Sequence, residues 1–296
     1  MQKKELSIDS VITDHESSGR YISVDGINTF ALCYGRGEPV VCIHGVPTSS
    51  FLYRKVLQSL SKKGYKGISI DLPGFGLTDR PKDFEYSFSN FADFLSKALT
   101  RLKVKKYHLV VHDIGGPIGF ALAARHPSKV MSLSILNTWI DVVNFKKPLV
   151  MRPFEKKLVG EAELKMITHA TWPVMFKAMG VVRSEKIPLA EINAYVDLLK
   201  MKDDGKAFLK VMRNFDHSED FRELCLNSVQ NVRYPVQAIW GDKDSGLTLS
   251  RYGREIQKTA NLREIERLPA KHFLQEESWL AIADRIVEQA KSVHLK

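Results

Sequence analysis

The sequence predicts an α/β fold, in which a mostly parallel sheet of eight strands is flanked by helices and interrupted by one helical insertion. From residue 21 to 136, short β-rich runs alternate with helical stretches, a pattern typical of parallel sheets. Between residues 141 and 230 the strand signal disappears, and one helical stretch follows another. Strands then return. We therefore predict a core domain formed by 1–140 and 231–296, with a helical cap, 141–230, inserted after the sixth strand.

The eight strands are predicted from runs of β-branched and aromatic residues bounded by turn residues. They cover residues 21–24, 29–34, 40–44, 67–71, 108–112, 130–136, 236–240 and 263–268. The first two flank Asp25 and Gly26, a turn signal that predicts an antiparallel hairpin.

Helices are predicted over 51–62, 89–102, 117–125 and 278–293. The third begins with Pro117. Proline suits the first turn of a helix, because the N–H group that it lacks would have no acceptor within the helix.

The charge pattern excludes some partners. The chain has 296 residues, 44 of them Lys or Arg and 34 Asp or Glu, which gives a formal net charge of +10. The predicted cap is almost balanced, with 15 basic and 13 acidic side chains, which gives no support for an acidic substrate. Because no nucleic-acid-binding module accompanies the excess, we interpret it as a solvated surface.

Cysteine usage and hydropathy predict the compartment. Cys33, Cys42 and Cys225 stand at no metal-ligand spacing, and their odd number favours a reducing environment. No apolar run is long enough to span a bilayer, and the first residues lack the apolar stretch of a signal peptide. We expect a cytoplasmic protein without membrane insertion; the sequence leaves the oligomeric state open.

The strongest chemical motif follows the fifth predicted strand, where Asp113 begins the run DIGG before a helix. A nucleophile on such a sharp strand-to-helix turn projects from the sheet toward a helix N-terminus, which favours negative charge. The chain contains no G-x-S-x-G, which disfavours a serine hydrolase. Alternatively, Asp113 only caps the helix.

Three further segments, each at the end of a predicted strand, favour the nucleophile. The loop after His44 can aim the Val46 N–H at a developing oxyanion. Asp244 follows a later strand and can orient a histidine, and His272 follows the last strand. The order nucleophile, acid, histidine is that of the α/β-hydrolase fold.

The chain resembles the aspartate-nucleophile branch of the α/β-hydrolases, which contains haloalkane dehalogenases and epoxide hydrolases. The resemblance covers about residues 20 to 290, and the motifs HGVPTSSFLYR at 44–54 and DLPGFGLTDRP at 71–81 are most similar to haloalkane dehalogenases. It implies Asp113 as nucleophile, His272 as base and Asp244 as acid. It also implies an oxyanion hole from the backbone N–H groups of Val46 and Ile114.

The family mechanism implies a small apolar substrate and water, with no metal and no organic cofactor. Asp113 attacks an sp³ carbon to form an alkyl ester, and water activated by His272 hydrolyses that ester. A non-catalytic binding protein of the same fold is the rival from another class, but it normally lacks a triad member.

Assistance to the leaving group separates the two chemistries of the branch. Dehalogenases usually hold the halide with Trp after the nucleophile and with Asn in the histidine-glycine loop or a second Trp in the cap, whereas this chain has Ile114 and Val46 at the first two positions. Epoxide hydrolases commonly use cap tyrosines. The candidate contacts that remain are Trp139, Trp172, Tyr195 and His217, so both alternatives stay open.

Overall fold

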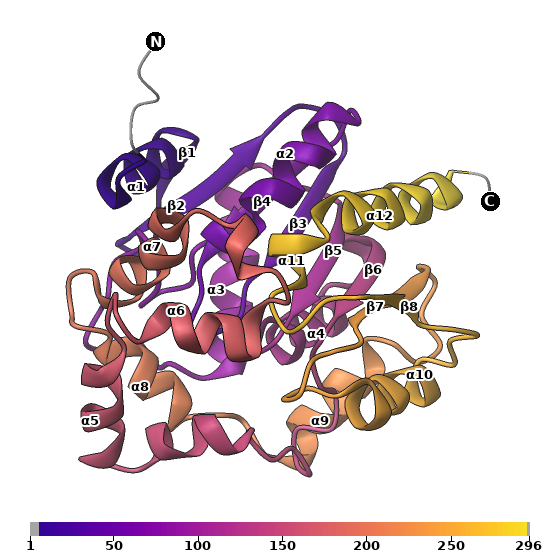
Figure 1. The fold of residues 1–296 in the computed structure, drawn as a ribbon. Helices are drawn as coiled ribbons and strands as arrows, with labels where there is room; N and C mark the ends of the chain where they lie inside the picture. Colours follow the sequence, from indigo (N-terminus) through magenta and orange to yellow (C-terminus); the bar gives the residue numbers. More distant parts are fainter. Residues whose placement is uncertain (1–5, 295–296) are drawn as a thin grey trace.

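The computed structural model, which describes residues 6–294, contains one eight-stranded sheet (Figure 1). Its strand order is β1-β2-β4-β3-β5-β6-β7-β8. β2 is antiparallel to both of its neighbours, and all other neighbouring strands are parallel. This confirms the predicted fold class. The strands are β1 (Gly19–Val24), β2 (Ile27–Tyr34), β3 (Pro39–Ile43), β4 (Lys66–Ile70), β5 (Tyr107–His112), β6 (Val130–Leu136), β7 (Val236–Gly241) and β8 (Glu266–Leu268).

At the two ends of the sheet, the structure confirms one predicted feature and shortens another. Asp25 and Gly26 both have positive φ, 50° and 81°, and join β1 to β2 as the turn signal predicted. β8 is shorter than the predicted 263–268, because only Glu266, Arg267 and Leu268 pair with β7.

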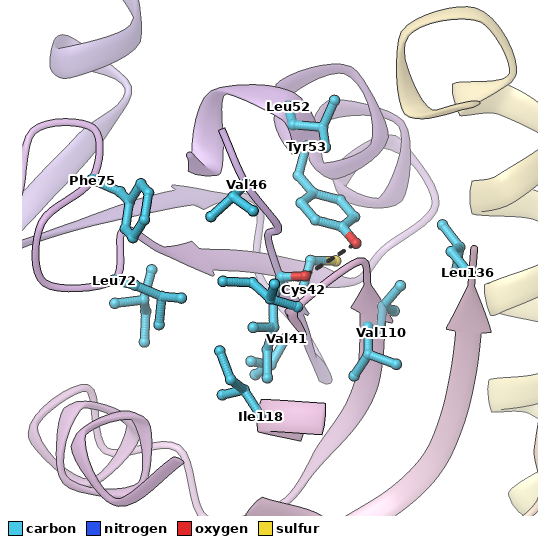
Figure 2. Packing of buried hydrophobic residues seen from close by; sticks show 14 of the residues in the cluster. Val41, Cys42, Val46, Leu52, Tyr53, Leu72, Phe75, Val110, Ile118 and Leu136 are labelled. Carbon is cyan, nitrogen blue, oxygen red and sulfur yellow. Dashed lines mark hydrogen bonds between the residues drawn. The ribbon is translucent and has the colours of Figure 1, made fainter. Parts of the chain in front are cut away.

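Helices cover both faces of the sheet. α2 packs with α12 over one face, and α3 packs with α4 over the other (Figure 1). Between the sheet and α4, the side chains of Val41, Val110 and Ile118 are buried in the core (Figure 2). The helical elements outside the β6–β7 connection are α1 (Ile8–Ser17), η1 (Ser50–Tyr53), α2 (Arg54–Lys62), α3 (Phe88–Arg101), α4 (Gly115–Arg125), η2 (Pro127–Lys129), η6 (Leu249–Gly253), α10 (Arg254–Thr259), α11 (Leu274–Glu277) and α12 (Trp279–Val293). Within residues 6–294, none of the helices has the length and apolar character needed to cross a bilayer.

The connection between β6 and β7, all of which the structure describes, contains helices and no strand. These helices are η3 (Leu149–Glu155), α5 (Val159–Met166), α6 (Trp172–Met175), η4 (Phe176–Gly180), η5 (Ser184–Lys186), α7 (Leu189–Lys200), α8 (Lys206–Met212) and α9 (Glu219–Asn227). α9 packs against α4, a helix of the predicted core. The division into core and cap stays a prediction.

The N-terminal helix α1 was not among the predicted elements. Its first turn is closed by a capping box, in which the side chains of Ser7 and Ser10 each accept a hydrogen bond from the other residue's backbone N–H. α1 packs against α7, so the N-terminal part of the chain contacts the β6–β7 insertion.

A buried ionic cluster joins the insertion to the core. Arg54 on α2 pairs with the buried Glu276 on α11 and with Glu191 on α7, and Lys55 contacts Glu276 at 2.8 Å. The hydroxyl of Tyr195 on α7 donates to Glu276 at 2.5 Å. Burial would raise the pKa of Glu276, but the adjacent cations outweigh burial and lower this pKa to about 2.

Glu276→Gln is expected to destabilise the protein by about 3 kcal/mol or more at pH 7, because it removes the buried carboxylate that pairs with both Arg54 and Lys55 and leaves these two cations to share Glu191. Since the folded-state pKa of Glu276 is lowered, this contribution is present at neutral pH and is lost as the pH falls toward about 2. Urea unfolding measures the change. The control Glu288→Gln, which removes an exposed partner of Arg285, should cost less than about 1 kcal/mol. Equal changes in the two variants would contradict the assignment.

Candidate active site

Asp113 lies in a sharp turn between β5 and α4. Its φ of 54° is in the left-handed region, which a residue other than glycine adopts only when its surroundings enforce it. Here the Asp113 N–H donates to the Asn137 carbonyl at 3.0 Å, and the Thr138 hydroxyl donates to the Asp113 carbonyl at 2.6 Å. Two residues after β6 therefore hold the backbone of the predicted nucleophile.

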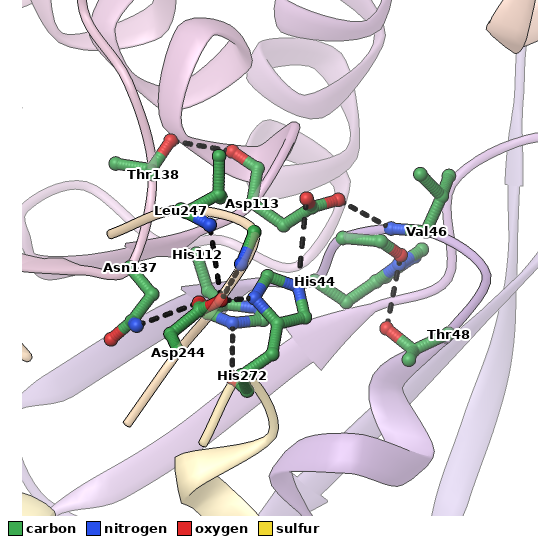
Figure 3. Close-up of polar contacts among 12 residues, drawn as sticks. His44, Val46, Thr48, His112, Asp113, Asn137, Thr138, Asp244, Leu247 and His272 are labelled. Atoms are coloured by element: carbon green, nitrogen blue, oxygen red, sulfur yellow. Dashed lines mark hydrogen bonds and ion pairs between the residues drawn. The ribbon is translucent and has the colours of Figure 1, made fainter. Parts of the chain in front are cut away.

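The loop after β3 approaches the Asp113 carboxylate from the other side (Figure 3). The Val46 N–H donates to Asp113 Oδ1 at 2.8 Å. Gly45 is required for this approach, because a Cβ there would lie 2.3 Å from the Cβ of Asp113. The backbone of Ile114 also acts to lower the pKa of the Asp113 carboxyl. Of the two predicted backbone donors, Val46 thus donates directly to this carboxylate and Ile114 favours its charged form.

His272 lies between two carboxylates (Figure 3). Its Nδ1 donates to Asp244 Oδ2 at 2.8 Å, and its Nε2 lies 3.6 Å from Asp113 Oδ2. Asp244 is held by the N–H groups of Gly246 and Leu247 at 2.8 and 3.0 Å. The structure therefore brings the three predicted catalytic side chains together, in an order that lets the ring exchange a proton on the Asp113 side while Asp244 fixes its tautomer.

The pKa values of these groups are coupled through their charges. Burial would raise the pKa of Asp244, but the His272 charge and hydrogen bonds hold it at about 2. Burial would lower the pKa of His272, but the two carboxylates raise it above its ordinary value. For Asp113, burial dominates and raises the pKa, although His272 and the backbone donors oppose this.

Two buried histidines position the loops of the site. His112, at the end of β5, donates from Nε2 to the His272 carbonyl at 2.9 Å, and the two rings lie 4.6 Å apart. His44 donates from Nδ1 to the Gly45 carbonyl at 2.9 Å and accepts from the Leu72 N–H at 3.1 Å. The ring nitrogens of both histidines that make these contacts bind backbone groups and not the Asp113 carboxylate, so both histidines support backbone positions.

The loop that carries His272 is also bound to the β6–β7 insertion. The Phe273 N–H donates to the Gly180 carbonyl at 2.8 Å, and the Lys271 ammonium donates to the Lys177 carbonyl at 2.7 Å. The carboxylate of Glu277 accepts from the N–H of Val182 at 2.8 Å. The position of the predicted base thus depends on the end of η4.

A cavity of about 330 Å³ opens above Asp113, Asp244 and His272. Most of its other lining side chains are aliphatic or aromatic, and Met151, Met175, Met179 and Met212 are among them. Such a lining suits a small apolar ligand. Within residues 6–294, no three side chains of the types His, Cys, Asp and Glu cluster as they would to hold a metal ion.

The four candidate leaving-group contacts fall into two pairs. Trp139 and Trp172 both line the cavity, and neither buried indole N–H has a hydrogen-bond partner. Tyr195 and His217 do not line it. The Tyr195 hydroxyl is bound to Glu276, and His217 Nδ1 donates to the Val142 carbonyl at 2.9 Å.

Sequence reasoning assigned no role to Asn137 in this site. Its side-chain N–H donates to Asp244 Oδ2 at 2.8 Å, and its Oδ1 accepts from the Gly241 N–H at 2.8 Å. The available signal was the position of Asn137 directly after a buried strand, next to the strand that leads to Asp244.

Comparison with known proteins identifies the family. A model described as the alpha/beta hydrolase fold matches residues 38–278, and the chain belongs to this family. A haloalkane dehalogenase of Mycobacterium marinum is 25% identical over 266 residues, which cover 85% of this chain and 84% of that protein. A cis-3-alkyl-4-alkyloxetan-2-one decarboxylase of Shewanella oneidensis is 41% identical over 132 residues, which cover 44% of this chain and only 41% of that protein.

The solved structure of the epoxide hydrolase CorEH has the same fold. It superimposes with a TM-score of 0.75 at 17% sequence identity, covering 93% of this chain and 99% of that chain. The predicted family resemblance is confirmed, and the chain is similar to members that act on different substrates.

The raised pKa of His272 is expected to fall in Asp244→Asn, because the largest charge that favours the imidazolium is removed. The stabilisation that this pair gives the wild type is present below the ordinary histidine pKa and is lost as the pH rises through the raised value. NMR titration of the His272 ring measures the change. Asp242→Asn, which alters an exposed neighbour, should leave the titration unchanged. A similar shift in both variants would show that Asp244 has no special role.

Proposed function

We propose that this protein is a hydrolase that forms a covalent alkyl ester on Asp113 and then hydrolyses it, acting on a small alkyl halide. The observation that carries the proposal is the position of His272 Nε2, 3.6 Å from the buried Asp113 carboxylate, while Nδ1 is bound to Asp244. This arrangement supports a carboxylate nucleophile followed by base-activated water.

In the first step, a carboxylate oxygen of Asp113 attacks the sp³ carbon of the substrate. The new C–O bond forms as the carbon–halogen bond breaks, and the halide leaves with the bonding electrons. The Val46 N–H holds Asp113 Oδ1 at 2.8 Å and leaves Oδ2 as the oxygen that faces His272. Burial of the carboxylate supports this role, because a less hydrated anion is the stronger nucleophile.

In the second step, His272 takes a proton from water, and the resulting hydroxide attacks the ester carbonyl carbon. The negative charge develops on the oxygen that the N–H groups of Val46 and Ile114 face. Asp244 stabilises the imidazolium. Collapse of the intermediate breaks the bond between the carbonyl carbon and the alkoxy oxygen, and the alcohol leaves with the proton from His272.

The donors in the cavity support an alkyl halide over an epoxide. A halide leaves as a stable anion that N–H donors stabilise, and the candidate donors are the indole N–H groups of Trp139 and Trp172, which are buried without a partner in side chains that line the cavity. An epoxide oxygen requires a proton as the ring opens. The tyrosine that the sequence suggested for this task, Tyr195, is bound to Glu276 outside the cavity lining.

A strained lactone is a second candidate substrate. The 132-residue match to the oxetan-2-one decarboxylase supports it, since attack on the sp³ ring carbon would release a carboxylate, another stable anion. A non-catalytic binding protein is the remaining alternative, but all three members of the triad are present.

Incubation of His272→Gln with panels of haloalkanes, epoxides and oxetan-2-ones is expected to leave a covalent adduct on Asp113, because the ester forms but its hydrolysis loses its base. Intact mass spectrometry distinguishes the classes, since a haloalkane adds its alkyl group and the ring substrates add their whole mass. Asp113→Asn should give no adduct. If no panel yields an adduct and the wild type turns over no member, the ester mechanism is excluded for these classes.

Trp139→Phe and Trp172→Phe are each expected to lower haloalkane turnover by about 10- to 100-fold, because each loses one N–H donor to the departing anion. Rates of halide release provide the measurement, and thermal unfolding checks the fold. Trp279→Phe changes a half-buried indole outside the cavity lining and should retain the wild-type rate. Equal losses in all three variants would contradict a leaving-group role.

A further inference from the structure

The cavity contains one cation whose role the proposed mechanism does not use. Lys147, in the segment between β6 and η3, lines the same cavity as Asp113 and His272. It is the only Lys or Arg among the described residues of that lining. Its side chain is 6% exposed, so its ammonium cannot rely on bulk water for hydration.

The Lys147 ammonium is held by one carboxylate and one aromatic ring. Nζ lies 2.7 Å from Glu155 Oε1 and 3.7 Å from the centre of the Phe215 ring. Phe215 belongs to an aromatic wall that also contains Phe145 and Trp139, whose rings stack at 3.7 Å. The unpartnered indole N–H of Trp139 lies in this wall. A buried ammonium and an unpartnered N–H group thus belong to neighbouring side chains of the cavity lining, which also contains Asp113, Asp244 and His272.

Glu155, the carboxylate that pairs with Lys147, lies where another anion can replace it. The Glu155 side chain is 44% exposed and does not line the cavity, whereas Lys147 is buried and does. Glu155 can therefore return to water at little cost, but Lys147 needs an anion wherever Glu155 goes. A carboxylate that enters through the cavity would replace the partly exposed Glu155 as the partner of Lys147, so the buried ammonium would keep an anionic partner.

We propose that the cavity binds ligands with an apolar chain that ends in a carboxylate, and that this carboxylate takes the place of Glu155 on Lys147. Lys147 is then the residue that determines specificity at one end of the cavity. The opposite end of the ligand lies against Asp113, and its reaction there rests on the proposed function. The balanced net charge of the insertion did not indicate this ligand class, because a net charge over 90 residues does not reveal whether one ammonium is buried in a cavity.

Binding of hexanoate and of the neutral isostere hexanamide tests the proposal without requiring any reaction. Isothermal titration calorimetry of the wild type should show tighter binding of hexanoate. Lys147→Met should weaken hexanoate by about 10- to 100-fold, the range for a hydrogen bond to a charged group, and leave hexanamide unchanged. Lys147→Arg should retain most of the hexanoate affinity, and Glu155→Gln should increase it, because the competing carboxylate is gone.

The proposal is overturned if hexanoate binds no better than hexanamide in both the wild type and Glu155→Gln, or if Lys147→Met weakens both ligands equally. It is also overturned if Lys147→Met abolishes bromide binding but not hexanoate binding, which would assign a free halide to this residue. Thermal unfolding of each variant checks the fold. If Lys147→Met is unstable, the hexanoate affinities of Lys147→Arg and Glu155→Gln still test the proposal. Failure of the Asp113 adduct experiment would leave these binding results unchanged.

Discussion

The site depends on the burial of two carboxylates that share one imidazole. Asp113 and Asp244 are both removed from water, and His272 supplies at most one positive charge between them. The remaining stabilisation comes from neutral donors: backbone N–H groups on each carboxylate and the amide of Asn137 on Asp244. Each donor belongs to a loop at the carboxyl end of a parallel strand, and all of them converge at this edge of the sheet.

The same constraint couples the core to the insertion above it. The His272 loop cannot move freely, because its neighbour Phe273 is hydrogen-bonded to Gly180 and Glu277 accepts from Val182. In the same short helix as Glu277, Glu276 is bound to Arg54 of α2 and to Tyr195 of the insertion. The insertion and the loop of the proposed base His272 are therefore held by one continuous set of contacts.

Local patterns were sufficient to predict the strands and the fold class, because β-rich runs and turn residues repeat along the chain, as at Asp25 and Gly26. They also placed Asp113, Asp244 and His272 at strand ends, and the structure brings these three together. What the sequence could not supply was the direction of each side chain in the insertion. Tyr195 and Trp172 are both aromatic residues of helices there, yet one faces Glu276 and the other the cavity. Only packing decides between these faces.

The long sequence separation within the Arg54–Glu276 pair, 222 positions, has a consequence for synthesis on the ribosome. Apart from His272 and Phe273, all residues that line the cavity are made before the loop after β8 exists. During that interval the growing chain exposes an apolar surface, and a guanidinium lacks the main partner it has in the finished protein. We expect this stage to be the one at which the nascent chain is most prone to aggregate and most in need of a chaperone.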